Sequence, residues 1–235
     1  MEDWRLKPAR DLDHQFFRRW RSVQRETGLA ESLIRFVWWG TVRTLLKTVH
    51  RLEVTGWERL PAAPPFVLAA NHSSHLDALV LAASMPLRWR DSVFPLAAGD
   101  TFFEKSAVAA FAATCLNAFP VWRKQASSKG PIDLRRRLEE DQCVYIVFPE
   151  GTRSRDGRMA PFKAGVGMLA AGSAIPVVPC RLTGTFESFP PGRFIPRPRK
   201  VKLRIGEPLS FQDETNDAKG WRRIAAAIEE RVQAL

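Results

Sequence analysis

The sequence predicts an α/β fold, with a central mixed sheet flanked by helices and preceded by N-terminal amphipathic helices. Two observations support this prediction. From residue 51 onward, short apolar runs typical of buried strands alternate with segments of helical periodicity. Before residue 51, apolar and basic residues recur together at helical spacing. We therefore expect two regions, residues 1–50 and 51–235, in a chain of 235 residues that can build one sizeable core.

The N-terminal region is expected to form two helices. A short one, from Leu12 to Arg25, carries aromatic residues on one face and arginines around them. In a longer one, from Glu31 to Arg51, the expected apolar face consists of Ile34, Val37, Trp38, Val42, Leu45, Leu46 and Val49. Another side is expected to carry Arg35, Arg43, Lys47 and Arg51. Such helices can lie in the membrane interface, and the alternative is that their apolar faces pack on the core.

The later elements are predicted from hydrophobic periodicity and turn residues. Strands are expected over 51–55, 65–70, 93–98, 118–122, 143–148, 176–182 and 201–205. Helices are expected over 107–116, 132–141, 165–171 and 218–235, and a further helix follows Asp77. Alternation of this kind is typical of a sheet with helices on both faces.

Composition narrows the class of protein. Hydrophobic residues make up 45% and charged residues 26% of the chain, which excludes a disordered protein. The net charge of +11 favours an anionic partner, such as nucleic acid, anionic lipid headgroups or an acidic carrier protein. Three scattered cysteines are expected to be core residues. We see no apolar run of transmembrane length and no signal-peptide core, so we expect an unexported chain without a membrane span.

The segment Asn71-His-Ser-Ser-His-Leu-Asp77 is the first candidate for catalysis. It follows a predicted buried strand and opens a helix, the position at which α/β sheets often carry their catalytic groups. A chain that turns between His72 and Asp77 lets the carboxylate hold one imidazole nitrogen, which leaves the other nitrogen as a base. The alternative is a helix-capping loop with an ordinary surface histidine, and this spacing alone does not decide between them.

The segment Phe148-Pro-Glu-Gly-Thr-Arg-Ser154 also follows a predicted buried strand. Gly151 permits a tight turn whose N–H groups can face an anion, and Arg153 offers a planar fork suited to phosphate. Glu150 can accept a hydrogen bond from a hydroxyl group or orient Arg153; the alternative is a local Glu–Arg pair. Arg123 and Lys163 follow short apolar segments and can reach the edge of a site, or they are solvated charges.

These two segments resemble blocks I and III of the glycerol-phosphate/lysophosphatidate acyltransferase superfamily. Ala118-Phe-Pro-Val-Trp-Arg123 is similar to block II and Ile175-Pro-Val-Val-Pro179 to block IV, all in family order over roughly residues 51–207. Many members have Gly and Asp where this chain has Asn117 and Trp122. His75 lies inside block I without a role that the resemblance implies, and we expect it to be a bystander.

The resemblance implies the activity and the roles of the residues. His72 would be the general base and Asp77 its partner. The positions resembling those that bind the acceptor are Arg123, Glu150, Gly151, Thr152, Arg153 and Lys163. Members transfer a fatty acyl group from acyl-CoA or acyl carrier protein to a lysolipid or glycerol phosphate. The form of block III looks most like enzymes that acylate 1-acyl-glycerol-3-phosphate in phospholipid biosynthesis.

Further expectations follow. Acyl transfer in a ternary complex needs no cofactor beyond the acyl donor, and no residue set has the spacing of metal ligands. The N-terminal region would hold residues 51–235, the acyltransferase domain, at the cytoplasmic face of a membrane as a peripheral or monotopic protein. Alternatives are the same chemistry on glycerol-3-phosphate or another lysolipid, or a catalytically silent lipid-binding protein at the membrane surface. A nucleic-acid partner is suggested by charge alone, and since no binding motif supports it, none is expected.

Overall fold

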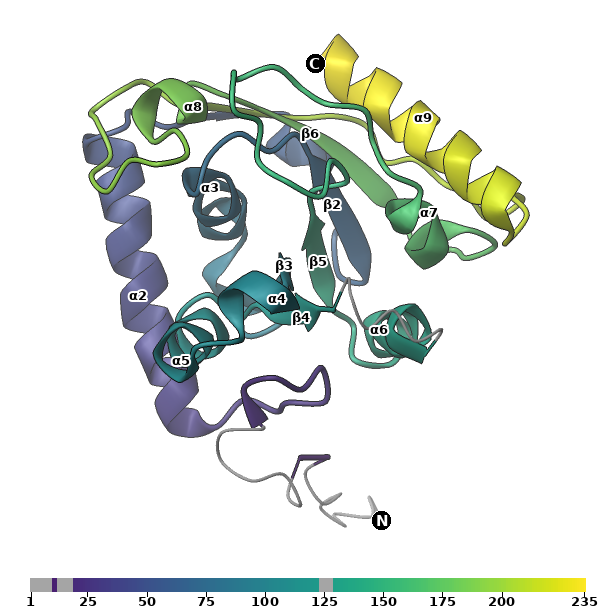
Figure 1. Ribbon diagram of the computed structural model, residues 1–235, viewed down its shortest axis with the longest axis horizontal. Coiled ribbons are helices and arrows are strands. Elements are labelled where there is room, and N and C mark those ends of the chain that lie inside the picture. The colour runs from purple at the N-terminus through teal and green to yellow at the C-terminus, as the bar shows by residue number, and fades with distance from the viewer. Residues whose placement is uncertain (1–9, 12–18, 123–128) are drawn as a thin grey trace.

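The computed structural model describes residues 10–11, 19–122 and 129–235 (Figure 1). Its centre is a seven-stranded sheet in the order β1-β7-β6-β2-β5-β3-β4. The strands are β1 Glu53–Thr55, β2 Phe66–Ala70, β3 Val93–Ala98, β4 Phe119–Val121, β5 Val144–Val147, β6 Val177–Thr183 and β7 Lys202–Ile205. All neighbouring strands are parallel except β6 and β7, which are antiparallel. The predicted mixed sheet is therefore confirmed, and each predicted strand lies close to its expected bounds.

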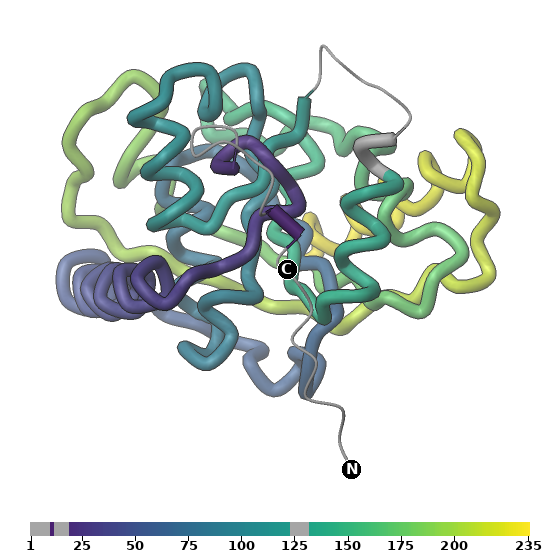
Figure 2. The backbone as a smooth tube through the Cα atoms, turned by 90° about the horizontal axis from the view of Figure 1, so that it is seen from below, coloured from purple at the N-terminus to yellow at the C-terminus, as the bar shows by residue number. Residues whose placement is uncertain are grey.

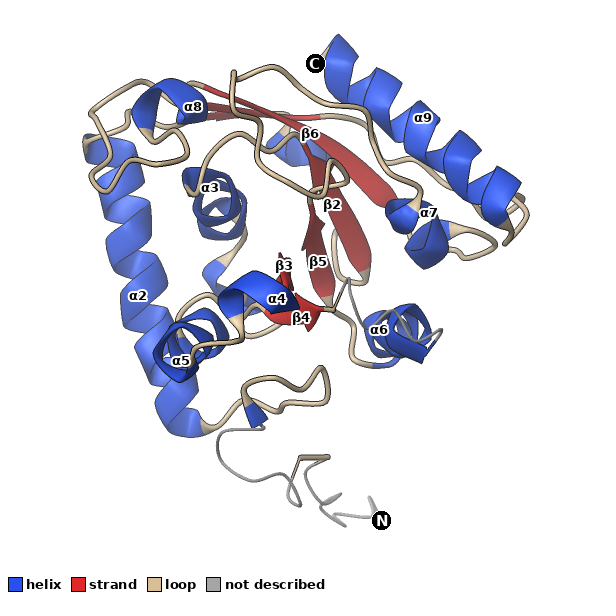
Figure 3. Ribbon diagram, in the orientation of Figure 1, coloured by secondary structure: helices blue, strands red, loops and turns tan. Residues whose placement is uncertain are grey.

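Helices lie on both sides of this sheet (Figure 3). They are α2 Leu29–Thr48, α3 Leu76–Ser84, α4 Gly99–Phe102, α5 Ser106–Thr114, α6 Lys129–Glu140, α7 Gly165–Ala170, α8 Thr185–Ser188 and α9 Ala218–Ala234, with short 3-10 turns at η1 Trp57–Arg59 and η2 Leu87–Trp89. Helices α4 and α8 were not predicted from the sequence, because a single turn is too short to show a hydrophobic period. Asp217 caps α9 by accepting hydrogen bonds from the N–H groups of Lys219 and Gly220.

Strand β2 divides two hydrophobic cores because side chains alternate across a sheet. Phe66 and Leu68 face the core that α2 and α3 cover, and Val67 and Ala69 face the core that α6, α7 and α9 cover. All residues of β2 are buried, as expected for a central parallel strand. The loop that follows β2 therefore extends from a strand that is packed on both faces.

The helix predicted from Leu12 to Arg25 is wrong over its described end. Residues 20–28 form turns and irregular backbone, whereas residues 12–18 lie outside the described residues. Side chains replace the helical hydrogen bonds here: Arg19 Nη2 donates to the carbonyl of Glu26 at 2.9 Å, and Arg25 turns into the interior. Arg25 is therefore buried, and not one of the arginines surrounding the aromatic face of a helix.

The helix predicted from Glu31 to Arg51 is confirmed as α2, and the basic side predicted to carry Arg35 and Arg43 faces the interior. Arg35 is 1% exposed, because its Nε is paired with Asp91 Oδ1 at 2.8 Å beneath the helix. Arg43 also turns inward and donates to the carbonyls of Ala83 and Met85. The outward face instead carries Leu29, Leu33, Phe36, Val37 and Leu45, all exposed. No helix in the described part of the chain is both long and apolar enough to cross a bilayer.

Candidate active site

The two segments singled out in the sequence meet at one edge of the sheet. Residues 71–77 follow β2 and residues 148–154 follow β5, and these two strands are parallel neighbours. Parallel strands end at the same edge, which is where α/β proteins place their ligands. The sheet topology therefore brings together two segments that are far apart in the sequence.

His72 and Asp77 form a hydrogen-bonded pair. His72 Nδ1 lies 2.9 Å from Asp77 Oδ2, and this carboxylate oxygen also accepts from the N–H groups of Ser73 and Ser74 at 2.7 Å each. Asp77 is fully buried, whereas the side chain of His72 remains 20% exposed. The imidazole also stacks on Phe148, with ring centroids 4.0 Å apart. With Nδ1 held, Nε2 is the nitrogen available to take a proton.

The main chain of His72 is held from both sides by the segment after β5. Its N–H donates to Glu150 Oε1 at 2.6 Å, and its carbonyl accepts from the N–H of Ser154 at 2.8 Å. Glu150 Oε2 accepts from the N–H of Ala160 at 3.0 Å, so both carboxylate oxygens bind main chain rather than Arg153. Burial raises the pKa of Glu150, and these two N–H groups oppose that rise. Of the two roles left open for Glu150, orienting Arg153 has no support among its contacts in the described residues, and contact with the acceptor stays a prediction.

Arg153, Gly151 and Lys163 form a cationic edge beside His72. Arg153 Nη1 contacts His75 Nε2, and partial burial lowers the pKa of the guanidinium. Gly151 has a left-handed φ of 75°, and a Cβ there would lie 2.9 Å from Lys163 Nζ. The left-handed φ therefore favours glycine at this turn, and Lys163 lies close beside it.

A cavity of about 850 Å³ begins at these residues. His72, Thr152, Arg153 and Lys163 line part of it, and most of the remaining lining residues are apolar, such as Leu96, Trp122 and Leu169. This volume is within the range of roughly 300–1,000 Å³ that is typical of ligand pockets. A polar edge on an apolar cavity suits an amphipathic ligand.

The predicted site residues thus fall into three groups. His72, Gly151, Thr152, Arg153 and Lys163 line the cavity, and Asp77 and Glu150 support His72 from behind. Arg123 lies outside the described residues. No cluster of His, Cys, Asp and Glu that could hold a metal ion is found within the described ranges.

Sequence reasoning missed the partnership of His75 with Arg153. Burial first, and the nearby guanidinium second, lower the pKa of His75 to about 4, so the imidazole is neutral and its Nε2 can accept from Arg153. A single histidine in a loop gives no signal of a partner 78 positions later. The close packing of Trp122 was also unforeseen: a Cβ at Gly99 would lie 2.6 Å from its indole.

Together, the fold and the site define a class: an α/β protein with a carboxylate-held histidine at the polar edge of a lipid-sized cavity. The acyltransferase family model matches residues 51–183, more than half of the chain. The chain therefore belongs to the acyltransferase family, and the resemblance predicted from the four blocks is confirmed.

Individual relatives agree with this assignment. The 1-acyl-sn-glycerol-3-phosphate acyltransferase alpha of Mus musculus is 30% identical over 174 residues, covering 71% of this chain and 58% of the mouse protein. The BAT2 chloroplastic 1-acyl-sn-glycerol-3-phosphate acyltransferase of Brassica napus is 31% identical over 150 residues, covering 61% and 40%. These matches span less than two thirds of either relative.

A solved structure supports the fold. The crystal structure of the 1-acyl-sn-glycerophosphate acyltransferase PlsC from Thermotoga maritima is 25% identical in sequence and superposes with a TM-score of 0.63. The match covers 87% of this chain and 77% of that one. The shared region therefore includes both the sheet and most of the helices around it.

Proposed function

We propose that the protein transfers a fatty acyl group from an acyl thioester, either acyl-CoA or acyl carrier protein, to the free hydroxyl of a lysophospholipid. The acceptor that we favour is 1-acyl-glycerol-3-phosphate, which would place the reaction in phospholipid biosynthesis. The observation that carries the proposal is that His72, held by Asp77, lines the same apolar cavity as Arg153 and Lys163. The names of the mouse and rapeseed relatives support this choice of acceptor.

The proposed chemistry is a direct transfer within a ternary complex. His72 Nε2 takes the proton of the acceptor hydroxyl while the oxygen attacks the thioester carbonyl carbon. The tetrahedral intermediate then collapses, the C–S bond breaks, and the leaving thiolate takes the proton from the imidazolium. Asp77 stabilises that imidazolium between the two proton transfers. General base catalysis of this kind supplies roughly 10²-fold to 10⁴-fold in rate.

The cationic edge would bind the phosphate of the acceptor. Arg153 can donate two parallel hydrogen bonds to phosphate oxygens, and Lys163 adds a second positive charge beside Gly151. Binding the phosphate there holds the hydroxyl next to His72, and positioning of this kind lowers the barrier of a reaction between two substrates. Thr152 and Arg123 remain predicted contributors to this site.

We also propose a location at the cytoplasmic face of a membrane, and the exposed apolar stripe of α2 supports the membrane contact. Leu29, Leu33, Phe36 and Val37 are 93%, 65%, 49% and 60% exposed. Phe111 on α5 is 44% exposed and packs edge-on against Trp38 of α2, which widens this apolar surface. A contiguous exposed apolar surface beside a lipid-sized cavity suits an interfacial helix.

The first experiment follows the release of free thiol from a long-chain acyl-CoA by the purified protein in detergent micelles. Lysophosphatidate, glycerol phosphate or neither is added, and His72→Ala is measured in parallel. Acceptor-dependent release that the variant loses supports the acyltransferase and chooses between the two acceptors. If no thiol is released from acyl-CoA, acyl carrier protein is tested as the donor and other lysolipids as acceptors. No thiol release with any of these would favour a lipid-binding protein.

A further inference from the structure

The segment before α2 forms part of the wall of the apolar cavity. Arg21, Ser22, Val23 and Gln24 line it, although their backbone is neither helix nor strand. In Figure 1 this segment lies below α5 and β4, on the side of the molecule opposite α8. The catalytic loop lies toward α8, because the hydroxyls of Ser73 and Thr185 are 3.3 Å apart. The segment therefore forms the part of the wall that is remote from His72.

Figure 2, seen from below, shows the same segment crossing the face of the molecule nearest the viewer. An irregular wall of this kind has no ladder of main-chain hydrogen bonds to fix its position. Side chains hold it instead: Asp11 Oδ2 accepts from Arg19 Nε at 2.6 Å and from the N–H of Glu26 at 3.0 Å. These bonds shape the segment itself, and a separate contact fastens it to the sheet.

That contact is made by Asn117, which is 1% exposed. Its Nδ2 donates to the carbonyls of Asp91 and Val93, at 3.1 and 3.2 Å, and so ties it to the start of β3. Its Oδ1 accepts from Arg25 Nη2 and from Arg35 Nη1, both at 3.1 Å. The hydrogen-bonding capacity of the carboxamide is thereby used in full. One side chain therefore joins the sheet, α2 and the segment before α2.

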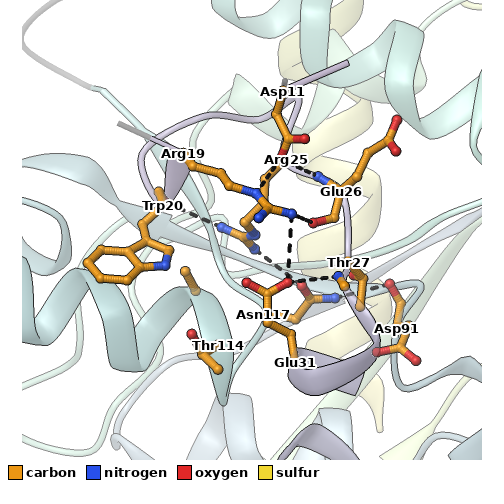
Figure 4. Close-up of polar contacts among 12 residues, drawn as sticks. Asp11, Arg19, Trp20, Arg25, Glu26, Thr27, Glu31, Asp91, Thr114 and Asn117 are labelled. Atoms are coloured by element: carbon orange, nitrogen blue, oxygen red, sulfur yellow. Dashed lines mark hydrogen bonds and ion pairs between the residues drawn. The ribbon is translucent and has the colours of Figure 1, made fainter. Parts of the chain in front are cut away.

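Arg25 is the residue that the segment contributes to this contact (Figure 4). It is 4% exposed, and it also donates to the carbonyls of Ala118 and Trp20, at 3.2 and 3.3 Å. Its hydrogen-bond acceptors within the described part of the chain are all uncharged oxygens, whereas Arg35 has the carboxylate of Asp91. Burial, together with the charges of Arg35 and Arg137, lowers the pKa of Arg25 to about 9.

Burying a guanidinium that has no carboxylate partner costs free energy, which reduces what it can contribute to the stability of the fold. An apolar side chain of similar volume could fill the same space at lower cost. The arginine instead fixes the position of the segment, because its planar guanidinium can donate to the carboxamide and the two carbonyls in only one arrangement. Ala118, one of its acceptors, lines the cavity, so the contact lies immediately behind the cavity wall.

We propose that Arg25 and Asn117 are positioning residues that hold the segment 19–27 as the closed end of the acyl cavity and thereby limit the length of acyl chain that the enzyme accepts. This inference rests on the proposed function, since it assigns the apolar cavity to the acyl chain. Neither residue touches the reacting atoms. Arg21 also donates to the carbonyl of Glu104 and Arg137 to that of Arg25, at 2.7 and 2.6 Å, so loss of Arg25 or Asn117 loosens the remote wall without detaching it. It leaves His72, Asp77 and Arg153 in place.

The test compares lauroyl-, palmitoyl- and stearoyl-CoA as donors in the thiol-release assay. Asn117→Gly removes the carboxamide without straining the backbone, because Asn117 has a φ of 55°, which glycine adopts readily. Arg25→Met keeps an unbranched apolar side chain and removes the hydrogen bonds. Arg43→Met is the matched control, because Arg43 is an inward-turned arginine that also donates to main-chain carbonyls, those of Ala83 and Met85.

We expect the ratio of kcat/KM for stearoyl-CoA to that for lauroyl-CoA to rise about tenfold or more in Arg25→Met and in Asn117→Gly. A single methylene in an apolar pocket already changes discrimination by about 10-fold to 200-fold. The double variant should show no more than either single change, because both remove the same contact. Arg43→Met should keep the wild-type ratio. Loss of stability alone lowers the rate with every donor and leaves the ratio unchanged.

Chain-length profiles of both variants within about twofold of wild type would overturn the proposal. A variant that fails to fold leaves the other to decide. Failure of the proposed function is distinguishable, because it abolishes thiol release with every donor in wild type. Competition of fatty acids of the same lengths for a bound fluorescent fatty acid, measured in the His72→Ala background, then tests the cavity without turnover. The same shift toward longer chains is expected there, and its absence would also overturn the proposal.

Discussion

Replacing Asp77 by asparagine isolates the charge that holds His72. At an effective dielectric constant of about 20, unit charges 2.9 Å apart attract each other by about 6 kcal/mol. Full loss of that attraction from the transition state corresponds to about four powers of ten in rate. The N–H groups of Ser73 and Ser74 already neutralise part of the charge. We therefore expect kcat to fall by about 10³-fold to 10⁴-fold.

The fold of this variant should survive. The asparagine oxygen can still accept from the N–H groups of Ser73 and Ser74. The new amide group would replace Asp77 Oδ1, which is buried without a partner among the described residues. A buried unsatisfied amide costs about 1–3 kcal/mol, which lowers Tm without unfolding the protein at assay temperature.

The assay is thiol release at saturating acceptor, with thermal unfolding measured on the same preparation. Asp156→Asn is the matched control, because Asp156 also accepts a main-chain N–H, from Arg158 at 3.0 Å, but lies exposed on the loop after the site. Its kcat should stay within about twofold of wild type, as is usual for surface substitutions. A folded Asp77→Asn enzyme with kcat within tenfold of wild type would refute the role of the pair.

Three further predictions concern the surroundings of the site. The pKa of His75 is lowered from 6.5 to about 4, so the unfolded chain takes up a proton between these pH values that the folded chain does not. The free energy of unfolding should therefore fall as the pH drops from 6.5 toward 4. Because His75→Gln lacks this titration, the difference in Tm between wild type and the variant should shrink over the same pH range. Glu150→Gln must turn its amide NH2 toward the N–H of His72 or Ala160. We therefore expect the free energy of unfolding, measured by urea titration, to fall by about 1–3 kcal/mol, and kcat to fall as well. Wild-type values for both would contradict the contact. Leu33→Asp with Val37→Asp should abolish sedimentation with anionic vesicles while thiol release in micelles persists, and undiminished sedimentation would remove α2 from the membrane contact.

The strands were predictable from the sequence because their signal is local. In β5 and β6, buried apolar runs stand between turn residues, so period and length identify them without knowledge of their neighbours. The pairing of the two candidate segments was predictable for a related reason. Each follows a buried strand, and parallel strands end at one edge of the sheet.

The N-terminal region was less predictable because it depends on long-range partners. Periodicity placed Arg25 and Arg35 away from the apolar faces of the expected helices, and charged residues are rarely buried. Both are buried because the carboxamide of Asn117 and the carboxylate of Asp91 lie beneath them, more than 50 positions away. The available signal was the presence of Asn117 where many family members have glycine. That departure indicates that the Asn117 side chain has a role, because the backbone conformation at this position favours glycine.

The same reasoning applies to Glu150. Its position in block III indicated a polar role, but the identity of its partners depends on how the loops after β2 and β5 face each other. No local sequence pattern identifies a carboxylate that accepts hydrogen bonds from the main chain of a neighbouring loop. The site was therefore predictable as a set of residues and only partly as a set of contacts.

The edge strand β1 has a consequence for how the chain is made. Glu53 of β1 pairs with Lys202 of β7, a separation of 202 − 53 = 149 residues, whereas β2 pairs with β5 and β6. Among the described strands, β1 is thus made first, and it pairs only after β7 has been made. Non-local pairing of this kind slows folding and leaves strand edges open in the meantime. Until β7 has been made, β1 has no strand to pair with in this sheet, so its edges stay open to aggregation throughout that period.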